Sequence, residues 1–153
     1  MGYAIAKAAA MEDANVTLVS CTKSLPVPDG INVVYVENAR ELNTSMNLYY
    51  DSSDVVIMAA AVADYRPVNQ SDHKIKKEEN SSLDIKLELN PDILLELGER
   101  KKEQFLVGFA AETNDVIRYG QEKIKKKNLD MLIANDVAMP GAGFNAVSYT
   151  HLR

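Results

Sequence analysis

Lysines at two places in the chain have a spacing that suits a polyanionic ligand. Lys74, Lys76 and Lys77 place three ammonium groups within four residues. At 4 Å two unit charges interact by about 4 kcal/mol at an effective dielectric constant near 20, so a bound triphosphate would offset their repulsion. A solvated charge run beside Glu78 and Glu79 explains the same pattern, and taken alone it is the favoured interpretation.

The second pair of lysines is Lys123 and Lys127. Because they are four residues apart, they share one face of a predicted helix. Lysines near the end of a helix also complement the helix dipole, which is the structural alternative to ligand binding. Lys125 and Lys126 point elsewhere, and we expect them to face solvent.

An aspartate and a helix start supply further polar candidates. Asp64 follows the small residues 59–63, which let a ligand approach the backbone closely. Its carboxylate can accept a hydrogen bond from a sugar hydroxyl or an amine, or it can simply cap the next turn. Asn90, Pro91 and Asp92 have the types preferred at an N-cap, at the first helical position and in the first turn. Since Asp92 would repel a phosphate, the free N–H groups there suit a base or a ribose, and ordinary capping is the alternative.

Other motifs point to chemistry that the rest of the chain supports weakly. Tyr119 and Lys123 have the Y-x-x-x-K spacing of short-chain dehydrogenases, but no glycine-rich G-x-x-x-G-x-G loop accompanies them. His73 and His151 have no Cys/His cluster around them, so we expect no zinc site. The single cysteine, Cys21, fits a reducing cytoplasm.

The elements that position these residues alternate between strands and helices. The apolar run 55–61 lacks alternation, which is typical of a central parallel strand buried on both faces. Segment 83–89 alternates and predicts a half-buried strand, and the lysine-rich segment 62–79 predicts a long mobile loop. The other expected strands are 16–20, 31–36, 105–110 and 129–134, and the expected helices are 1–14, 39–50 capped by Asn38, 91–100 capped by Asn90, and a helix that runs from a Thr113 or Asn114 cap to Lys127.

This order predicts one α/β domain, a Rossmann-like three-layer sandwich with a mostly parallel sheet. Ligands of such folds bind at the carboxyl ends of the strands, here after Ala61, near Asn90, after Phe109 and after Ala134. The chain opens on a helix where these domains usually open on a strand, so the expected first strand is missing.

The composition fits a globular domain. The chain has 153 residues, 46% of them hydrophobic, and a net charge of −5 from 17 basic and 22 acidic side chains. The acidic balance argues against nucleic-acid binding. The longest apolar run, 55–63, is too short to cross a membrane.

Seven short segments follow one another along the chain, and together they are more specific for a protein family than any one of them alone. They are 60–66, 74–77, 90–93, 108–113, 127–130, 134–137 and 143–145. Together they resemble the phosphopantothenoylcysteine synthetases, which form the C-terminal half of bacterial bifunctional decarboxylase/synthetases. The resemblance covers a domain of residues 1–145, and residues 146–153 form a tail without a family match that we expect to be foreign.

The resemblance implies a ligase of coenzyme A biosynthesis. In this reaction the carboxylate of 4′-phosphopantothenate attacks the α-phosphate of CTP, pyrophosphate leaves, and an acyl-cytidylate forms. The amine of L-cysteine then attacks the activated carbonyl and releases CMP. Mg²⁺ would accompany the triphosphate. The family further implies a cytoplasmic homodimer, with no flavin on this part of the chain and neither nucleic acid nor membrane as a partner.

The matching motifs also imply roles for individual residues. Lys74 would contact the phosphates from a flap that closes over the site, and is the expected catalytic residue. Ala60 and Ala61 would offer backbone groups to phosphopantothenate, and no residue is assigned to a metal. The nucleotide would be held by Asp64, Lys74, Pro91, Asp92, Ile93, Leu94, Phe109, Lys123 and Lys127.

The sequence departs from the family at both ends. The family carries a strand, a glycine-containing loop and an asparagine that handles the acyl-cytidylate immediately before the position of Met1. We therefore expect a truncated chain that binds nucleotide and turns over poorly. An NAD(P)-dependent oxidoreductase using Tyr119 and Lys123 and a non-catalytic nucleotide-binding subunit stay open as alternatives. The preference for CTP over ATP rests on the resemblance.

Overall fold

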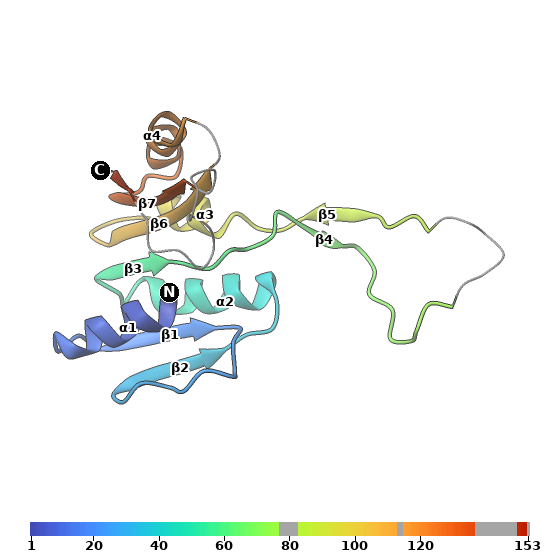
Figure 1. Ribbon diagram of the computed structural model, residues 1–153, viewed down its shortest axis with the longest axis horizontal. Helices are drawn as coiled ribbons and strands as arrows, with labels where there is room; N and C mark the ends of the chain where they lie inside the picture. The colour runs from blue at the N-terminus through green and yellow to red at the C-terminus, as the bar shows by residue number, and fades with distance from the viewer. Residues whose placement is uncertain (77–82, 113–114, 137–149, 153) are drawn as a thin grey trace.

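The computed structural model describes residues 1–76, 83–112, 115–136 and 150–152, and Figure 1 shows how its elements are arranged. The helices are α1 (Gly2–Met11), α2 (Ala39–Tyr50), α3 (Ile93–Glu99) and α4 (Val116–Lys126). The strands are β1 (Val16–Ser20), β2 (Ile31–Tyr35), β3 (Val55–Met58), β4 (Tyr65–Pro67), β5 (Leu87–Leu89), β6 (Phe105–Glu112), β7 (Met131–Asp136) and β8 (Thr150–Leu152).

The main sheet is divided into two pieces. Strands β1 and β2 pair in parallel, and so do β3, β6 and β7, with β8 antiparallel on the far side of β7. β1 and β3 point the same way (Figure 1), and no strand pairing joins them within the described part of the chain. The expected Rossmann-like α/β class is confirmed.

The core lies between the larger piece of the sheet and helices α2 and α3. Leu106 of β6 and Leu132 of β7 are almost fully buried, as are Tyr50 at the end of α2 and Leu97 of α3. Helix α4 lies against β6, β7 and β8. Burial of these large apolar side chains is the main contribution that stabilises the packing of the helices on the sheet. This packing holds the carboxyl ends of β3, β6 and β7 in a fixed arrangement.

Strand β3 differs from the strand that its sequence predicts. Val56 and Met58 are buried, but Val55 and Ile57 are 55% and 39% exposed. The expectation of burial on both faces is therefore wrong. Its physical reason is that the core covers one face of β3 only, because α1 packs mainly on β1 and β2 and α4 packs mainly on β6, β7 and β8.

Strands β4 and β5 form an antiparallel ribbon that projects from the body (Figure 1), and we call residues 65–76 and 83–89 the arm. The sequence predicted a loop over 62–79, but β4 lies within it. The strand predicted over 83–89 shrinks to β5 and is not half-buried. The alternating apolar side chains of this strand are 52–65% exposed because β5 pairs with β4 alone; they are Leu83, Ile85, Leu87 and Leu89.

The helix starts confirm one expected cap and correct another. Asn38 caps α2, since its Oδ1 accepts a hydrogen bond from the Glu41 N–H at 2.9 Å. Helix α3 begins two residues later than expected, because Asp92 and not Asn90 is its N-cap. Asp115, in the left-handed region at φ 44°, precedes α4. The caps expected for α4, Thr113 and Asn114, lie outside the described residues, as does the loop expected over 141–145.

Candidate functional site

The carboxyl ends of β3, β6 and β7 meet at one edge of the sheet. They do so because the strands are parallel and in register, with Met58 beside Gly108 and Glu112 beside Asp136. Segment 59–64 continues from β3 at this edge, and its Ala60, Ala61 and Asp64 are exposed. Segment 59–64 therefore offers an exposed backbone and the carboxylate of Asp64 at this edge.

Asn90 joins the predicted aspartate to the predicted helix start. Its backbone N–H donates to the carbonyl oxygen of Asp64 at 2.8 Å, and its Nδ2 donates to the carbonyl oxygen of Ala63 at 2.8 Å. Residues 63–64 and the segment beginning at Pro91 are thus held side by side, although they are far apart in the sequence. Asn90 does not also cap α3, because its Oδ1, the atom that a cap would use, accepts from Arg66 Nη1 at 2.9 Å.

Asp92 and Lys127 form an ion pair in the same region. Asp92 Oδ1 caps α3 by accepting from the Leu95 N–H at 3.2 Å, and the same oxygen lies 2.8 Å from Lys127 Nζ. The Lys127 side chain is only 21% exposed. This pair neutralises the carboxylate that, in isolation, would repel an anion. No local pattern predicts this pair, because the two residues are 35 positions apart.

Gly98 allows α3 and the end of α4 to approach closely enough for this pair to form. A Cβ built on Gly98 would lie 1.9 Å from the carbonyl oxygen of Lys127, which is an impossible contact with backbone. Asn128, in the left-handed region at φ 51°, donates from Nδ2 to the Gly98 carbonyl oxygen at 3.0 Å. Gly98 was not singled out from the sequence, because a glycine inside a helical pattern does not reveal what packs against it.

A comparison with known proteins decides the family. A family model, the DNA/pantothenate metabolism flavoprotein C-terminal domain, matches residues 1–151. The chain belongs to this family. The coenzyme A biosynthesis bifunctional proteins CoaBC of Bacillus subtilis (strain 168) and Escherichia coli (strain K12) are 48% and 45% identical to it. Each alignment covers 95% of this chain, but only 36% and 37% of those proteins. The expected family is confirmed, and the chain spans little more than a third of these relatives.

Solved structures agree with this assignment. The crystal structure of the C-terminal domain of a coenzyme A biosynthesis bifunctional protein CoaBC has a TM-score of 0.77 and 38% identity, and the match covers 99% of this chain and 71% of that one. A DNA/pantothenate metabolism flavoprotein from Streptococcus pneumoniae has the same fold, with a TM-score of 0.75 at 18% identity over 97% of this chain and 80% of that one. The family match continues past residue 145, and β8 pairs with β7 within the tail, whose foreign origin stays a prediction.

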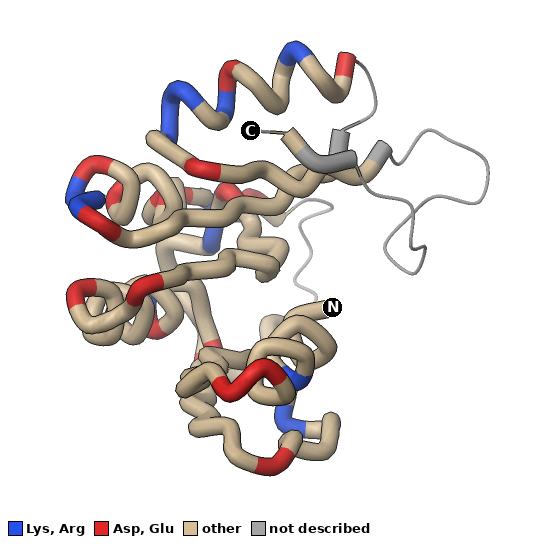
Figure 2. Tube along the Cα trace, turned by 90° about the vertical axis from the view of Figure 1, so that its left-hand side faces the viewer, with Lys and Arg blue, Asp and Glu red and all other residues tan. Residues whose placement is uncertain are grey.

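Helix α4 carries the remaining basic residues that the family resemblance assigned to the nucleotide. Figure 2 shows basic residues gathered toward the C-terminal end of this helix. Lys123 is partly buried one turn before Lys127, and Phe109 is partly buried on β6. Lys125 and Lys126 are exposed, as expected. Lys123, Lys127 and Phe109 therefore lie on or directly beside α4 and β6, and these two elements pack against each other.

Lys74 was also assigned to the nucleotide, but the structure does not bring it close to the other residues with that assignment. It is exposed, and it lies on the arm beyond β4, where the chain extends away from the body (Figure 1). In this family member the body and the arm therefore carry separate parts of the predicted site.

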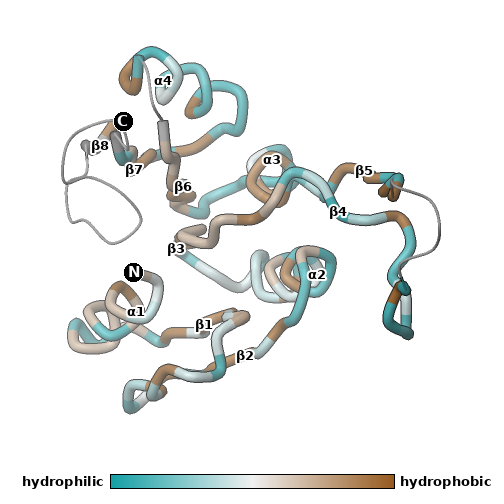
Figure 3. The backbone as a smooth tube through the Cα atoms, turned by 45° about the vertical axis from the view of Figure 1, so that its right-hand side comes forward, coloured by the Kyte–Doolittle hydropathy of each residue, from teal (hydrophilic) through white to brown (hydrophobic). Residues whose placement is uncertain are grey.

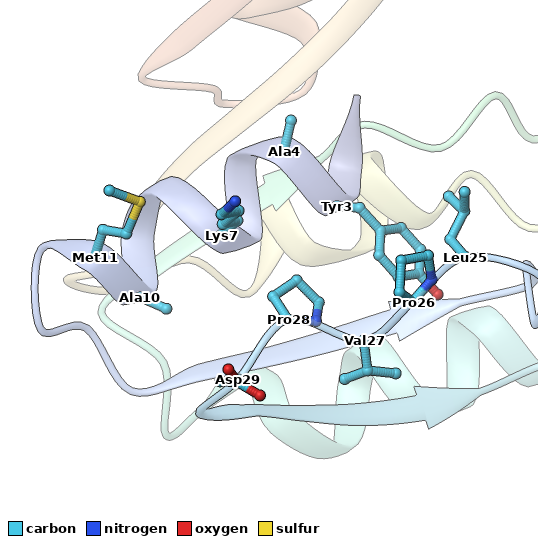
Figure 4. A pocket seen from close by; sticks show the side chains of 10 residues that line it. All are labelled: Tyr3, Ala4, Lys7, Ala10, Met11, Leu25, Pro26, Val27, Pro28 and Asp29. Carbon is cyan, nitrogen blue, oxygen red and sulfur yellow. The ribbon is translucent and has the colours of Figure 1, made fainter.

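A surface pocket of about 560 Å³ lies away from these residues. It is formed by α1 and the loop 25–29 (Figure 4). Tyr3 at its rim donates a hydrogen bond to the Thr22 carbonyl oxygen at 2.7 Å, which ties the helix to the chain after β1. None of the described helices combines the length and apolar character needed to cross a membrane.

Proposed function

We propose that the chain is a phosphopantothenate–cysteine ligase domain of coenzyme A biosynthesis that uses CTP. The support is its identity of 48% and 45% to two coenzyme A biosynthesis proteins, together with the residues gathered at the strand ends. The observation that carries the proposal is the Lys127–Asp92 ion pair at the N-cap of α3, two residues after Asn90, whose backbone bonds to Asp64. The pair supports a site in which an ammonium group lies beside the start of α3 and the segment that follows β3.

The proposed nucleotide site has an assembled part and a part that must move. Lys123 and Lys127 would face the nucleotide phosphates from α4, while Asp64 and the start of α3 would hold the ribose and base. Lys74 would reach the triphosphate when the arm closes, and would stabilise the charge that develops as pyrophosphate leaves. Closure would also keep water away from the acyl-cytidylate, which water would otherwise hydrolyse.

The other substrates would enter beside the nucleotide. The open backbone at Ala60 and Ala61 would contact phosphopantothenate, whose carboxylate attacks the α-phosphate. The L-cysteine amine then displaces CMP from the acyl-cytidylate and loses a proton. The described residues contain no group of three or more His, Cys, Asp or Glu that could hold a metal. We therefore treat Mg²⁺ as part of the substrate, carried by the phosphates of CTP.

We further propose that the chain forms a cytoplasmic homodimer through the arm. The ribbon pairs Tyr65 with Leu89 and Pro67 with Leu87, so these four side chains share one face. Figure 3 shows the hydrophobic character of β5. Tyr65 is 57% exposed and Leu89 is 65% exposed, and an isolated two-stranded ribbon is at best marginally stable. A second copy of the same uncharged face would bury both.

Calorimetric titration of the chain with Mg–CTP, Mg–ATP and NADPH tests the nucleotide proposal. We expect saturable binding of CTP and weaker or no binding of the other two. Binding of NADPH alone would support the oxidoreductase alternative. A cooperatively folded chain that binds none of the three would contradict the proposed site.

A further inference from the structure

The base of the arm contains a hydrogen-bond network to which the proposed reaction assigns no role. Arg66 Nη1 donates to the Leu89 carbonyl oxygen at 2.7 Å and to Asn90 Oδ1 at 2.9 Å. Arg66 Nη2 lies 2.8 Å from Glu88 Oε1. Although it is on a projecting ribbon, the Arg66 side chain is only 26% exposed. The planar guanidinium therefore connects β4 to both the end of β5 and the residue that follows it.

Asn90 extends this network into the proposed nucleotide site. The amide oxygen of Asn90 accepts from Arg66, while its Nδ2 donates to Ala63 and its backbone N–H donates to Asp64. Pro91 is the next residue in the chain. The Asn90 side chain thus connects the arm to the segment that carries Asp64, and Asn90 itself begins the segment that leads into α3.

Glu88 connects the same network to the body. Its Oε1 accepts from Arg40 of α2 at 2.9 Å as well as from Arg66. The carboxylate between two guanidinium groups fixes the orientation of the ribbon relative to α2. Farther out, the Val68 N–H donates to the Lys86 carbonyl oxygen at 3.0 Å, and the described residues beyond this bond have no strand pairing. The network therefore fixes the base of the arm and leaves bending to its outer part.

We propose that Arg66 and Asn90 are positioning residues that set the direction in which the arm presents Lys74 to the nucleotide. This inference rests on the proposed function, because it assumes that Lys74 contacts CTP. Neither residue needs to touch the nucleotide. The network instead keeps the arm in register with Asp64 and the start of α3, so that closure of the outer part brings the ammonium group to the phosphates.

A double-mutant cycle on CTP affinity tests this inference. Lys74→Gln in the otherwise unchanged chain is expected to weaken Mg–CTP binding about tenfold, since it removes a charge-assisted hydrogen bond. In an Arg66→Met background the same change is expected to cost less than about threefold, because a misdirected arm has already lost that contact. Asn90→Asp, which keeps the acceptor for Arg66 and loses the Nδ2–H donor, is the second background if Arg66→Met does not melt cooperatively.

Arg100→Met is the matched control. Arg100 also links two elements, with Nη2 at 3.1 Å from Asp51, but it does not contact the arm. In this background Lys74→Gln should still cost about tenfold. The positioning role would be overturned if Lys74→Gln lowered CTP affinity equally in all backgrounds, or did not lower it in the otherwise unchanged chain. In either case, CTP binding by the parent chain would leave the proposed function standing. A parent chain that does not bind CTP would overturn both.

Discussion

The body and the arm place the leucines of their strands in opposite surroundings. Leu106 and Leu132, on the body strands β6 and β7, are 0% and 1% exposed. Leu87 and Leu89, on the arm strand β5, are 52% and 65% exposed. The difference comes from what covers each strand, because helices cover the body sheet and nothing in the described chain covers the ribbon. Burial therefore follows from neighbours and not from the side-chain pattern alone.

The same contrast divides the proposed site. In the body, Lys127 is already paired with Asp92, and Asn90 already joins Asp64 to the start of α3. On the arm, Lys74 is exposed and separated from these residues. We propose that the body part of the site is assembled before a ligand binds, whereas the arm part depends on movement.

Gly98→Ala is expected to have the largest effect, because its Cβ would collide with the Lys127 carbonyl oxygen. Separating α3 from α4 should lower the free energy of unfolding by about 3 kcal/mol, a cost typical of overpacking. Urea denaturation measures this change. Gly2→Ala in α1 is the control, since its Cβ would have no atom within 4 Å. If the two variants were equally stable, the close approach of α3 and α4 would not matter for stability.

Leu87→Ser is expected to weaken the homodimer and leave the monomer folded. Leu87 is 52% exposed in the monomer, so burying the rest of its side chain contributes about 1 kcal/mol per copy. The substitution removes it from both copies, which costs about 2 kcal/mol and corresponds to about thirtyfold in the dimer dissociation constant. Sedimentation equilibrium measures this constant. Lys86→Ser, whose side chain points to the other face of the ribbon by alternation, should change it little. Similar effects of both variants, or a monomeric parent chain, would contradict the proposed arm interface.

Lys127→Gln is expected to weaken CTP binding about tenfold, because it removes a charged partner for the phosphates and leaves Asp92 unneutralised. Lys126→Gln makes the same change of charge one residue earlier on an exposed side chain, and should have little effect. Titration calorimetry of both variants compares them directly. Equal losses would mean that only the general charge of α4 matters.

Asp130→Asn is expected to have the smallest effect, and it should depend on pH. Burial raises the pKa of Asp130, but hydrogen bonds from the Leu106 N–H and the Lys101 ammonium outweigh this and hold the pKa below its usual 3.8. A lowered folded-state pKa stabilises the protein above 3.8 and loses this contribution as pH falls through the folded-state value. At pH 7 the parent chain should be more stable by about 1 kcal/mol.

Urea denaturation of this pair of proteins from pH 7 down to pH 3 measures the dependence. The difference in unfolding free energy should shrink once the pH falls below 3.8. A difference that stays constant over the whole range would show that the charge of Asp130 does not contribute.

The sequence predicts the body well because its signals are local. The apolar run of β1 and the Asn38 cap of α2 are each decided within a few residues, and both are confirmed. Parallel strand order then places the candidate residues after β3, β6 and β7 at one edge, so much of the body part of the site follows from topology.

What the sequence misses depends on contacts between distant segments. The pairing of Asp92 with Lys127, the role of Asn90 and the packing at Gly98 each join α3 or its start to a remote segment. The exposure of β5 is a further case, since alternation indicates a strand but does not show whether another layer lies across from it.

Distance measurement by pulsed electron resonance tests the division between body and arm most directly. Spin labels on Asp72→Cys of the arm and Lys125→Cys of α4, in a Cys21→Ser background diluted with unlabelled chain, occupy exposed positions outside the proposed contacts. Saturating Mg–CTP should shorten the distance between the labels, because the arm closes over an assembled body site. An unchanged distance distribution, with CTP binding confirmed by calorimetry, would contradict the account.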